Sequence, residues 1–90
     1  MGANEQWVLR RRIGARLREL RLEKKIPSQE RLAELASVHR TYVGRLERGE
    51  SGVTVETLAA VLAAMSVSLA EFFRNFTQAT RPVRTARQRR

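Results

Sequence analysis

Residues 39–48, HRTYVGRLER, hold three arginines together with other side chains that can form hydrogen bonds. If this segment is helical, the apolar Val43 and Leu46 mark its buried face. Arg40 and Arg45 then point away from that face. Each guanidinium presents a planar fork of N–H donors, which matches the O6 and N7 acceptors on the major-groove edge of guanine. The segment therefore has the chemistry of base recognition.

His39 and Thr41 flank Arg40 at the start of the same segment. The methyl group of Thr41 can contact the methyl group of thymine, and its hydroxyl can reach a base or a phosphate. His39 lies in the N-cap region of the predicted helix, where it contacts the DNA backbone or a base. Gly44, between the two arginines of the segment, is predicted to leave room for the wall of the groove.

Residue types that catalysis and metal binding need are scarce. The chain has no cysteine and no aspartate, and His39 is its single histidine. A Ser-His-Asp triad cannot be assembled, although a glutamate could in principle orient the histidine. Thiolate nucleophiles, disulfides and cysteine zinc sites are excluded, as is a histidine-rich metal site within one subunit. We therefore predict no enzyme activity, no metal, no cofactor and no small-molecule ligand.

An excess of positive charge is the main feature of the composition. Among 90 residues, 18 are Lys or Arg and 9 are Asp or Glu, which gives a formal net charge of +9. Residues 77–90 hold five of the arginines and no acidic residue. A field of this sign attracts polyanions. The tail is too polar to bury a core, so we predict that it is disordered and adds electrostatic attraction to DNA.

The spacing of apolar residues predicts five short helices and no strand. The first helix starts at Trp7, after a disordered segment at residues 1–6, and Pro27 ends it. The second helix is expected over residues 29–36, with the hydroxyl of Ser28 as its N-cap.

The third helix is expected over residues 39–48, with Gly49 as the left-handed residue that ends it. A fourth helix follows, and Ser68 and Glu71 match a capping box at the start of the fifth. The second and third helices, joined by a break of two or three residues, form a helix-turn-helix pattern. Residues 7–76 are therefore expected to fold as one all-α domain.

Four pieces of the chain together resemble the phage-repressor-like (Xre/Cro-type) family of helix-turn-helix transcription regulators. These pieces are IGARLRELR (13–21), SQERLAELA (28–36), HRTYVGRLERG (39–49) and TVETLAAVLAAMSVSLAEFF (54–73). The third piece is most similar to the controller proteins of restriction–modification systems. The resemblance implies a compact five-helix bundle of the lambda-repressor-like type. It also implies a sequence-specific regulator that places residues 39–48, as a recognition helix, in the major groove.

The resemblance implies roles for single residues as well. Base contacts are expected from Arg40, Thr41 and Arg45. His39, at the start of the same helix, is expected to make a fourth base contact. DNA backbone contacts are expected from Ser28, Gln29, Tyr42, Arg48 and Ser51. Arg21 and Glu47 match the internal ion pair of the family, which is structural rather than catalytic. Ser37 stands where the family usually has glycine, and its left-handed backbone costs on the order of 1 kcal/mol.

Apolar side chains near the end of the predicted bundle exceed what so small a core is expected to hold. We predict that the surplus forms a dimer interface. The residues expected in it are Met65, Leu69, Phe72, Phe73 and Phe76. Members of the family commonly dimerise through the corresponding helices. A two-fold homodimer fits a palindromic operator in double-stranded DNA, with half-sites about one helical turn apart.

Two other functions are compatible with the sequence: an antitoxin that uses the same fold, and a basic protein that coats nucleic acid without sequence preference. Glu30 and Glu34, on an outward helix face, are either contacts for RNA polymerase or part of a solvated face. The longest apolar run, residues 58–65, is too short for a membrane span, and no signal-peptide pattern is found. We expect a cytoplasmic, nucleoid-associated protein.

Overall fold

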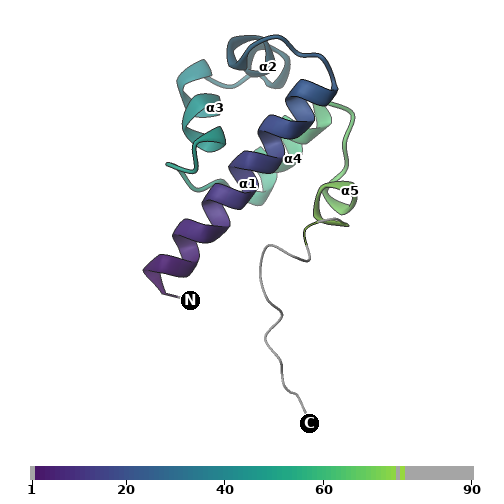
Figure 1. The fold of residues 1–90 in the computed structure, drawn as a ribbon. Coiled ribbons are helices and arrows are strands. Elements are labelled where there is room, and N and C mark those ends of the chain that lie inside the picture. Colours follow the sequence, from purple (N-terminus) through teal and green to yellow (C-terminus); the bar gives the residue numbers. More distant parts are fainter. Residues whose placement is uncertain (1, 75, 77–90) are drawn as a thin grey trace.

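The computed structural model describes residues 2–74 and residue 76. Every regular element in this part of the chain is a helix (Figure 1). The helices are α1 (Ala3–Glu23), α2 (Gln29–Ala36), α3 (Arg40–Glu47), α4 (Val55–Ala63) and α5 (Leu69–Arg74). The predicted all-α fold with five helices is confirmed. Residues 77–90, for which the sequence predicts disorder, lie outside the described residues.

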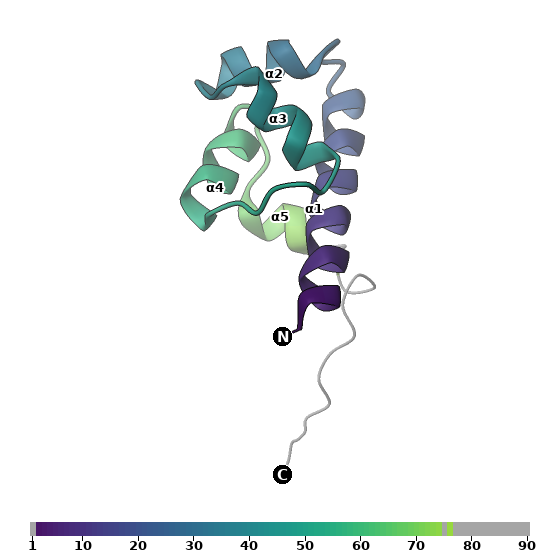
Figure 2. The same cartoon turned by 90° about the vertical axis from the view of Figure 1, so that its left-hand side faces the viewer.

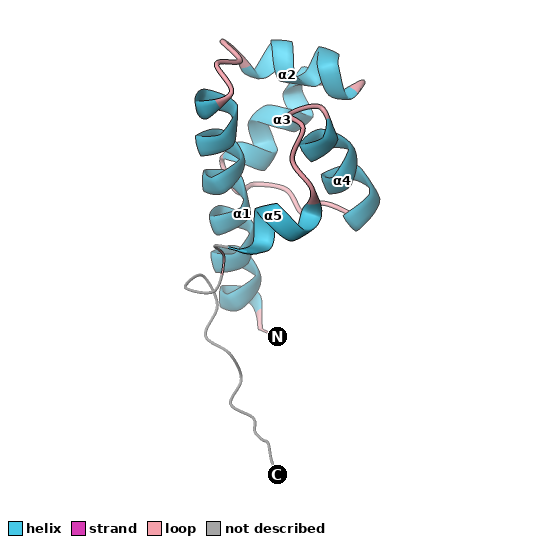
Figure 3. Ribbon diagram, turned by 90° about the vertical axis from the view of Figure 1, so that its right-hand side faces the viewer, coloured by secondary structure: helices cyan, strands magenta, loops and turns pink. Residues whose placement is uncertain are grey.

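The helix α3 lies between two neighbours, since it packs against both α1 and α2, whereas α4 packs against α2 and α5. Figure 1 shows α1 running from the N-terminus toward α2, and Figure 3 shows α5 on the side of the bundle away from α3. No helix in the described part of the chain is both long and apolar enough to cross a membrane. The fully buried side chains of the core are Leu17, Leu32, Val43, Leu46, Val61, Leu62 and Phe72.

The close approach of α1 to α3 depends on Gly14. A Cβ atom at this position would lie 2.6 Å from the carbonyl oxygen of Glu47, and closer still to that of Leu46. Both oxygens belong to the backbone, which cannot move aside as the end of a flexible side chain can. Gly14 therefore sets how near the last turn of α3 lies to α1.

The helix α1 begins earlier than the sequence predicts. The predicted start at Trp7 is wrong, because the helix already includes residues 3–6. The N–H of Gly2 donates to Oε1 of Glu5 at 2.6 Å, and a carboxylate in the first turn is favourable at the positive end of the helix dipole. Apolar spacing does not reveal this turn, because local polar contacts begin it. The domain boundaries drawn from the sequence stay predictions.

The helix α1 also ends before Pro27, at Glu23. Lys25 adopts left-handed backbone with φ 60°, and the N–H of Ile26 donates to the carbonyl oxygen of Arg21 at 3.0 Å. These contacts form a Schellman motif, which satisfies the last carbonyl groups of the helix. Pro27 lies beyond this motif, so the helix ends before the residue that the sequence predicts as its stop.

The two helices of the motif have the predicted N-caps. Oγ of Ser28 accepts a hydrogen bond from the N–H of Arg31 at 3.0 Å, and Nδ1 of His39 accepts one from the N–H of Thr41 at 3.1 Å. Ser37, in the turn between them, has φ 58°, so its predicted left-handed conformation is present. The turn therefore carries the predicted backbone strain at a residue with a Cβ atom.

The ends of α3 and α5 also follow local sequence signals. Gly49 has φ 76° and ends the third helix as predicted. The N–H of Glu71 donates to Oγ of Ser68 at 3.0 Å, and the N–H of Ser68 donates to Oε1 of Glu71 at 3.1 Å. This is the predicted capping box.

The five residues predicted for a dimer interface divide into two groups. Met65, Phe72 and Phe76 are only 3%, 0% and 9% exposed. The prediction that they face a partner is therefore wrong for these three residues, because they lie in the core of the single chain. Leu69 packs partly against that core, and Phe73 is 40% exposed. Of the five predicted residues, only these two keep apolar surface for a partner.

Candidate nucleic-acid interface

One face of α3 is polar and open to solvent. Val43 and Leu46 are 1% and 2% exposed in the core, whereas Arg40, Thr41 and Arg45 are exposed. This is the division that the sequence predicts. Figure 2 shows α3 at the front of the molecule. A large ligand can therefore reach the three polar side chains from this side.

A polar hollow lies between the start of α2 and the exposed face of α3. The first N–H groups of a helix have no partner within the helix. The hydroxyl oxygen of Ser28 accepts a hydrogen bond from the backbone N–H of Arg31. The backbone N–H groups of Gln29 and Glu30 are then available to bind an anion. This α2–α3 hollow is lined by Ser28, Gln29, Glu30, Arg40, Thr41, Gly44 and Arg48.

The hollow gathers about half of the predicted DNA contacts. Ser28, Gln29, Arg40, Thr41 and Arg48 line it. The other predicted contacts, which do not line it, are His39, Tyr42, Arg45 and Ser51. The structure thus brings predicted base contacts and predicted backbone contacts from two helices into one concave surface.

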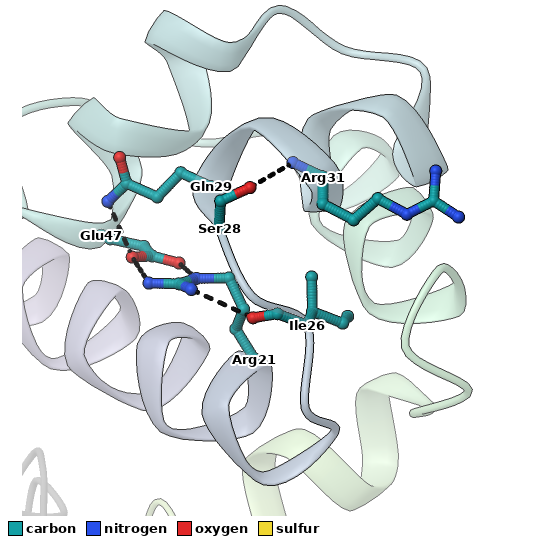
Figure 4. A network of polar contacts seen from close by, with 6 residues as sticks. All are labelled: Arg21, Ile26, Ser28, Gln29, Arg31 and Glu47. Atoms are coloured by element: carbon teal, nitrogen blue, oxygen red, sulfur yellow. Dashed lines mark hydrogen bonds and ion pairs between the residues drawn. The ribbon is translucent and has the colours of Figure 1, made fainter.

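The ion pair predicted between Arg21 and Glu47 is present and buried. Nε of Arg21 donates to Oε2 of Glu47 at 2.8 Å, and Nη2 donates to Oε1 at 3.2 Å. Nη1 of Arg21 donates to the carbonyl oxygen of Ile26 at 3.2 Å, and Nε2 of Gln29 donates to Oε1 of Glu47 at 2.9 Å (Figure 4). The network therefore joins α1, the end of α3 and the start of α2.

The network also orients Gln29 in the α2–α3 hollow. Glu47 accepts one of the two amide hydrogens of the Gln29 side chain, so Gln29 can still donate the other. A Cβ atom on Gly44 would lie 3.0 Å from Oε1 of Gln29 and 3.1 Å from Nη1 of Arg48. The prediction that Gly44 makes room for the groove wall stays a prediction, because Gly44 lines the α2–α3 hollow and the atoms above it are the ends of two flexible side chains. The space above it is taken by the side chains of Gln29 and Arg48.

Two of the predicted DNA-contacting arginines have acidic partners. Nε and Nη2 of Arg48 donate to the two carboxylate oxygens of Glu50 at 3.0 and 3.1 Å. Hydrogen bonding from Arg48 is the main reason why the pKa of Glu50 lies below its ordinary value. Nη1 of Arg40 lies 3.5 Å from Oε2 of Glu30.

Sequence analysis missed both acidic partners. The pair of Arg48 and Glu50 has a local signal, since opposite charges stand two residues apart at the end of a helix. The pair of Arg40 and Glu30 has none, because it depends on how α2 and α3 pack.

The remaining predicted contacts lie around this centre. Burial raises the pKa of Tyr42, so its hydroxyl stays protonated near neutral pH and can donate to a phosphate. The hydroxyl of Ser51 donates to the carbonyl oxygen of Gly52 at 3.1 Å. Arg45 is exposed and has no ion pair among the described residues. Within residues 2–74 and 76, no cluster of His, Cys, Asp or Glu side chains is placed to hold a metal ion.

Comparison with known proteins places the motif in a family. The sequence model of the helix-turn-helix family HTH_3 matches residues 17–72. The control protein C.SmaI of Serratia marcescens is 48% identical over 42 residues, which are 47% of this chain and 50% of that protein. The control protein C.MunI of Mycoplasma sp is 36% identical over 62 residues, which are 69% of this chain and 84% of that protein. The match to C.SmaI therefore spans half of that relative.

A solved structure has the same architecture. The crystal structure of the clp gene regulator ClgR from C. glutamicum superposes with a TM-score of 0.72 at 35% identity, covering 79% of this chain and 90% of that chain. The family match includes all of α2 and α3. The chain therefore belongs to the Xre-type helix-turn-helix family of DNA-binding transcription regulators, and it is similar to the control proteins of restriction–modification systems.

Proposed function

We propose that this protein is a sequence-specific DNA-binding transcription regulator that places α3 in the major groove. The observation that carries the proposal is the position of Arg40, Thr41 and Arg45 on the open face of a helix whose other face is fixed in the core. The two guanidinium groups are proposed to read guanine, and Thr41 to contact the methyl group of thymine. His39, at the N-cap, contacts a base or the backbone beside them.

A phosphate of the DNA backbone is proposed to bind in the α2–α3 hollow. The free N–H groups at the start of α2, the second amide hydrogen of Gln29 and the guanidinium of Arg48 are donors there. The hydroxyl of Ser28 adds a fourth donor. Tyr42 and Ser51 are proposed to bind neighbouring phosphates.

The acidic partners must release their arginines when DNA binds. The pairs of Arg40 with Glu30 and of Arg48 with Glu50 are both largely exposed. Exposed ion pairs are worth little, typically about 0–1 kcal/mol. Replacing the carboxylate partner of each arginine by a base edge or a phosphate therefore costs little free energy. Before DNA binds, the ion pairs hold the arginine side chains near the interface.

We further propose that the protein binds a palindromic operator as a homodimer. The exposed ring of Phe73 and the partly exposed Leu69 lie on α5, which leaves apolar surface on this helix. Figure 3 shows α5 on the side of the bundle away from α3, so contact through α5 leaves α3 of each protomer uncovered. A two-fold dimer that presents both copies of α3 to one duplex requires a palindromic site.

We infer that a protein with this activity works on nucleoid DNA in the cytoplasm. Contact with RNA polymerase, where the protein activates transcription, is proposed for the exposed face of α2 around Glu34. Glu34 and Glu30 each form an exposed ion pair, with Arg31 and Arg40 respectively, so pairing does not separate the two carboxylates for this role.

Selection of bound sequences from a random duplex pool tests the proposal. The expected result is a palindromic consensus with guanine in each half-site, because two arginines of each protomer face the major groove. A consensus without two-fold symmetry would contradict the homodimer. Recovery of sequences without any consensus would contradict base reading.

A further inference from the structure

A second hollow lies on the other side of the recognition helix, between α1 and the loop that joins α3 to α4. It has a volume of about 200 Å³. Its apolar lining comes from Leu9, Ile13 and Val53, and its polar lining includes Arg10 and Ser51. The polar side chains belong to two segments that are more than 40 positions apart in the sequence. This α1–loop hollow is separate from the α2–α3 hollow, since the two share no lining residue.

Two arginines of α1 lie directly on the backbone of this loop. Nε and Nη2 of Arg10 would lie 3.4 and 3.5 Å from a Cβ atom on Gly52. Cγ of Arg11 would lie 2.6 Å from a Cβ atom on Gly49. The two glycines therefore let the arginine side chains approach a loop that begins directly after the recognition helix.

Neither of these arginines has an ion pair among the described residues. By contrast, Arg16, on the same helix, is paired with Glu19 at 3.0 Å. An unneutralised guanidinium beside donors from the loop favours an anion. Ser51, with a hydroxyl, and Gln6, with a side-chain amide, line the same hollow as Arg10.

The position of the α1–loop hollow relative to α3 indicates which anion would bind there. Figure 2 shows the first turns of α1, the loop after α3 and α3 itself on the side of the molecule that faces the viewer. With α3 in the major groove, a sugar–phosphate strand runs along each side of that helix. One strand passes the α2–α3 hollow, and the other then passes the α1–loop hollow.

We propose that Arg10 binds a phosphate of the DNA backbone in the α1–loop hollow, so that the first turns of α1 are part of the DNA-binding surface. This inference rests on the proposed function, because it takes the orientation of DNA from α3. A bound phosphodiester accepts from the guanidinium of Arg10 and from the hydroxyl of Ser51, which exchanges its hydrogen bond to the carbonyl oxygen of Gly52 for the phosphate. Arg11 adds positive charge beside the same strand.

The test is the salt dependence of DNA binding for the full chain, measured for wild type, Arg10→Gln and Arg12→Gln. Arg12 is the matched control, because it carries the same charge on the same helix but is rotated by roughly 200° from Arg10. For Arg10→Gln we expect the slope of log K against log salt to fall by about 1 per bound protomer, on a selected duplex and on a scrambled one alike. For Arg12→Gln we expect the wild-type slope.

A pair of variants at Gly52, in the loop after α3, tests the same contact without changing α1. Gly52→Asp places a carboxylate beside the guanidinium of Arg10 and is expected to reduce the slope, whereas Gly52→Asn is its uncharged control. Arg10→Lys keeps the charge and is expected to keep the slope. Circular dichroism confirms that each variant is folded.

An unchanged slope in Arg10→Gln, or an equal loss in Arg12→Gln, would overturn the inference. The inference would also be overturned if Arg10→Gln changed the oligomeric state but not the salt slope of DNA binding, because Arg10 would then contact protein rather than DNA. Failure of the proposed function has a different signature. The wild-type protein would then bind the selected and scrambled duplexes equally, and the comparison of slopes would still report on Arg10.

Discussion

Arg21 and Glu47 form a buried two-point ion pair that joins α1 to the last turn of α3, with side chains 7% and 1% exposed. The same carboxylate accepts from Nε2 of Gln29, and the same guanidinium donates to the carbonyl oxygen of Ile26. One ion pair thus fixes the start of α2 relative to the recognition helix. Removal of either charge should therefore affect both folding and the shape of the α2–α3 hollow.

Glu47→Ala is expected to lower the free energy of unfolding by about 3–5 kcal/mol, because it leaves the guanidinium of Arg21 buried without a counter-charge. Urea unfolding followed by circular dichroism measures this change. The double variant Arg21→Met with Glu47→Leu replaces the pair by apolar side chains and is expected to recover most of the loss. A single variant as stable as wild type would show that solvent reaches Arg21.

The pH dependence of the loop after α3 follows from Arg48 and Glu50. Hydrogen bonding and charge from Arg48 lower the pKa of Glu50 in the folded protein. A carboxyl group whose folded pKa is lowered adds stability that is present above its ordinary value of 4.5 and is lost as the pH falls through the lowered value.

An NMR titration of the Glu50 carboxyl group should therefore have its midpoint below 4.5. In Arg48→Gln the midpoint is expected to move up toward that value, although Arg45 still contributes some attraction. Arg31→Gln, on the exposed face of α2, is the control and should leave the midpoint in place. A wild-type midpoint at or above 4.5 would contradict the ion pair.

Neighbouring phenylalanines on α5 separate the core from the proposed dimer interface. Phe72 is 0% exposed and Phe73 is 40% exposed, and their ring centroids lie 4.9 Å apart. Phe73→Glu is expected to shift the protein from dimer to monomer in analytical ultracentrifugation while the fold is retained. Phe72→Ala is expected instead to lower the free energy of unfolding by about 3–5 kcal/mol. A Phe73→Glu protein that sediments as wild type would exclude this surface as the interface.

Local signals in the sequence predicted much of the fold. Ser28 and Gly49 act over one turn of chain, so their roles as caps follow from residue type and spacing alone, whereas the left-handed conformation of Ser37 was predicted from the resemblance to a family. The same holds for the capping box of Ser68 and Glu71. The ion pair of Arg21 and Glu47 spans 26 positions, and only the resemblance to a family predicted it.

Features that depend on packing could not be predicted in this way. The spacing of Met65, Phe72 and Phe76 indicates an apolar surface, but it does not show whether that surface meets the same chain or a partner. The positions of the Gln29 and Arg48 side chains above Gly44 could not be predicted, because they are set by how α2 meets α3. The early start of α1 depends on a hydrogen bond at its first turn, which apolar spacing does not record.

The most direct test of base reading by α3 compares Arg40→Ala with Arg18→Ala. Arg18 is the matched control, because it is an exposed arginine of α1 that lines neither hollow. Affinities are measured at one salt concentration on the selected duplex and on a scrambled duplex. Arg40→Ala is expected to lose about 1–3 kcal/mol on the selected duplex and much less on the scrambled one, with relaxed preference at one base pair of each half-site. Equal losses on both duplexes, or a loss in Arg18→Ala as large as in Arg40→Ala, would contradict the account.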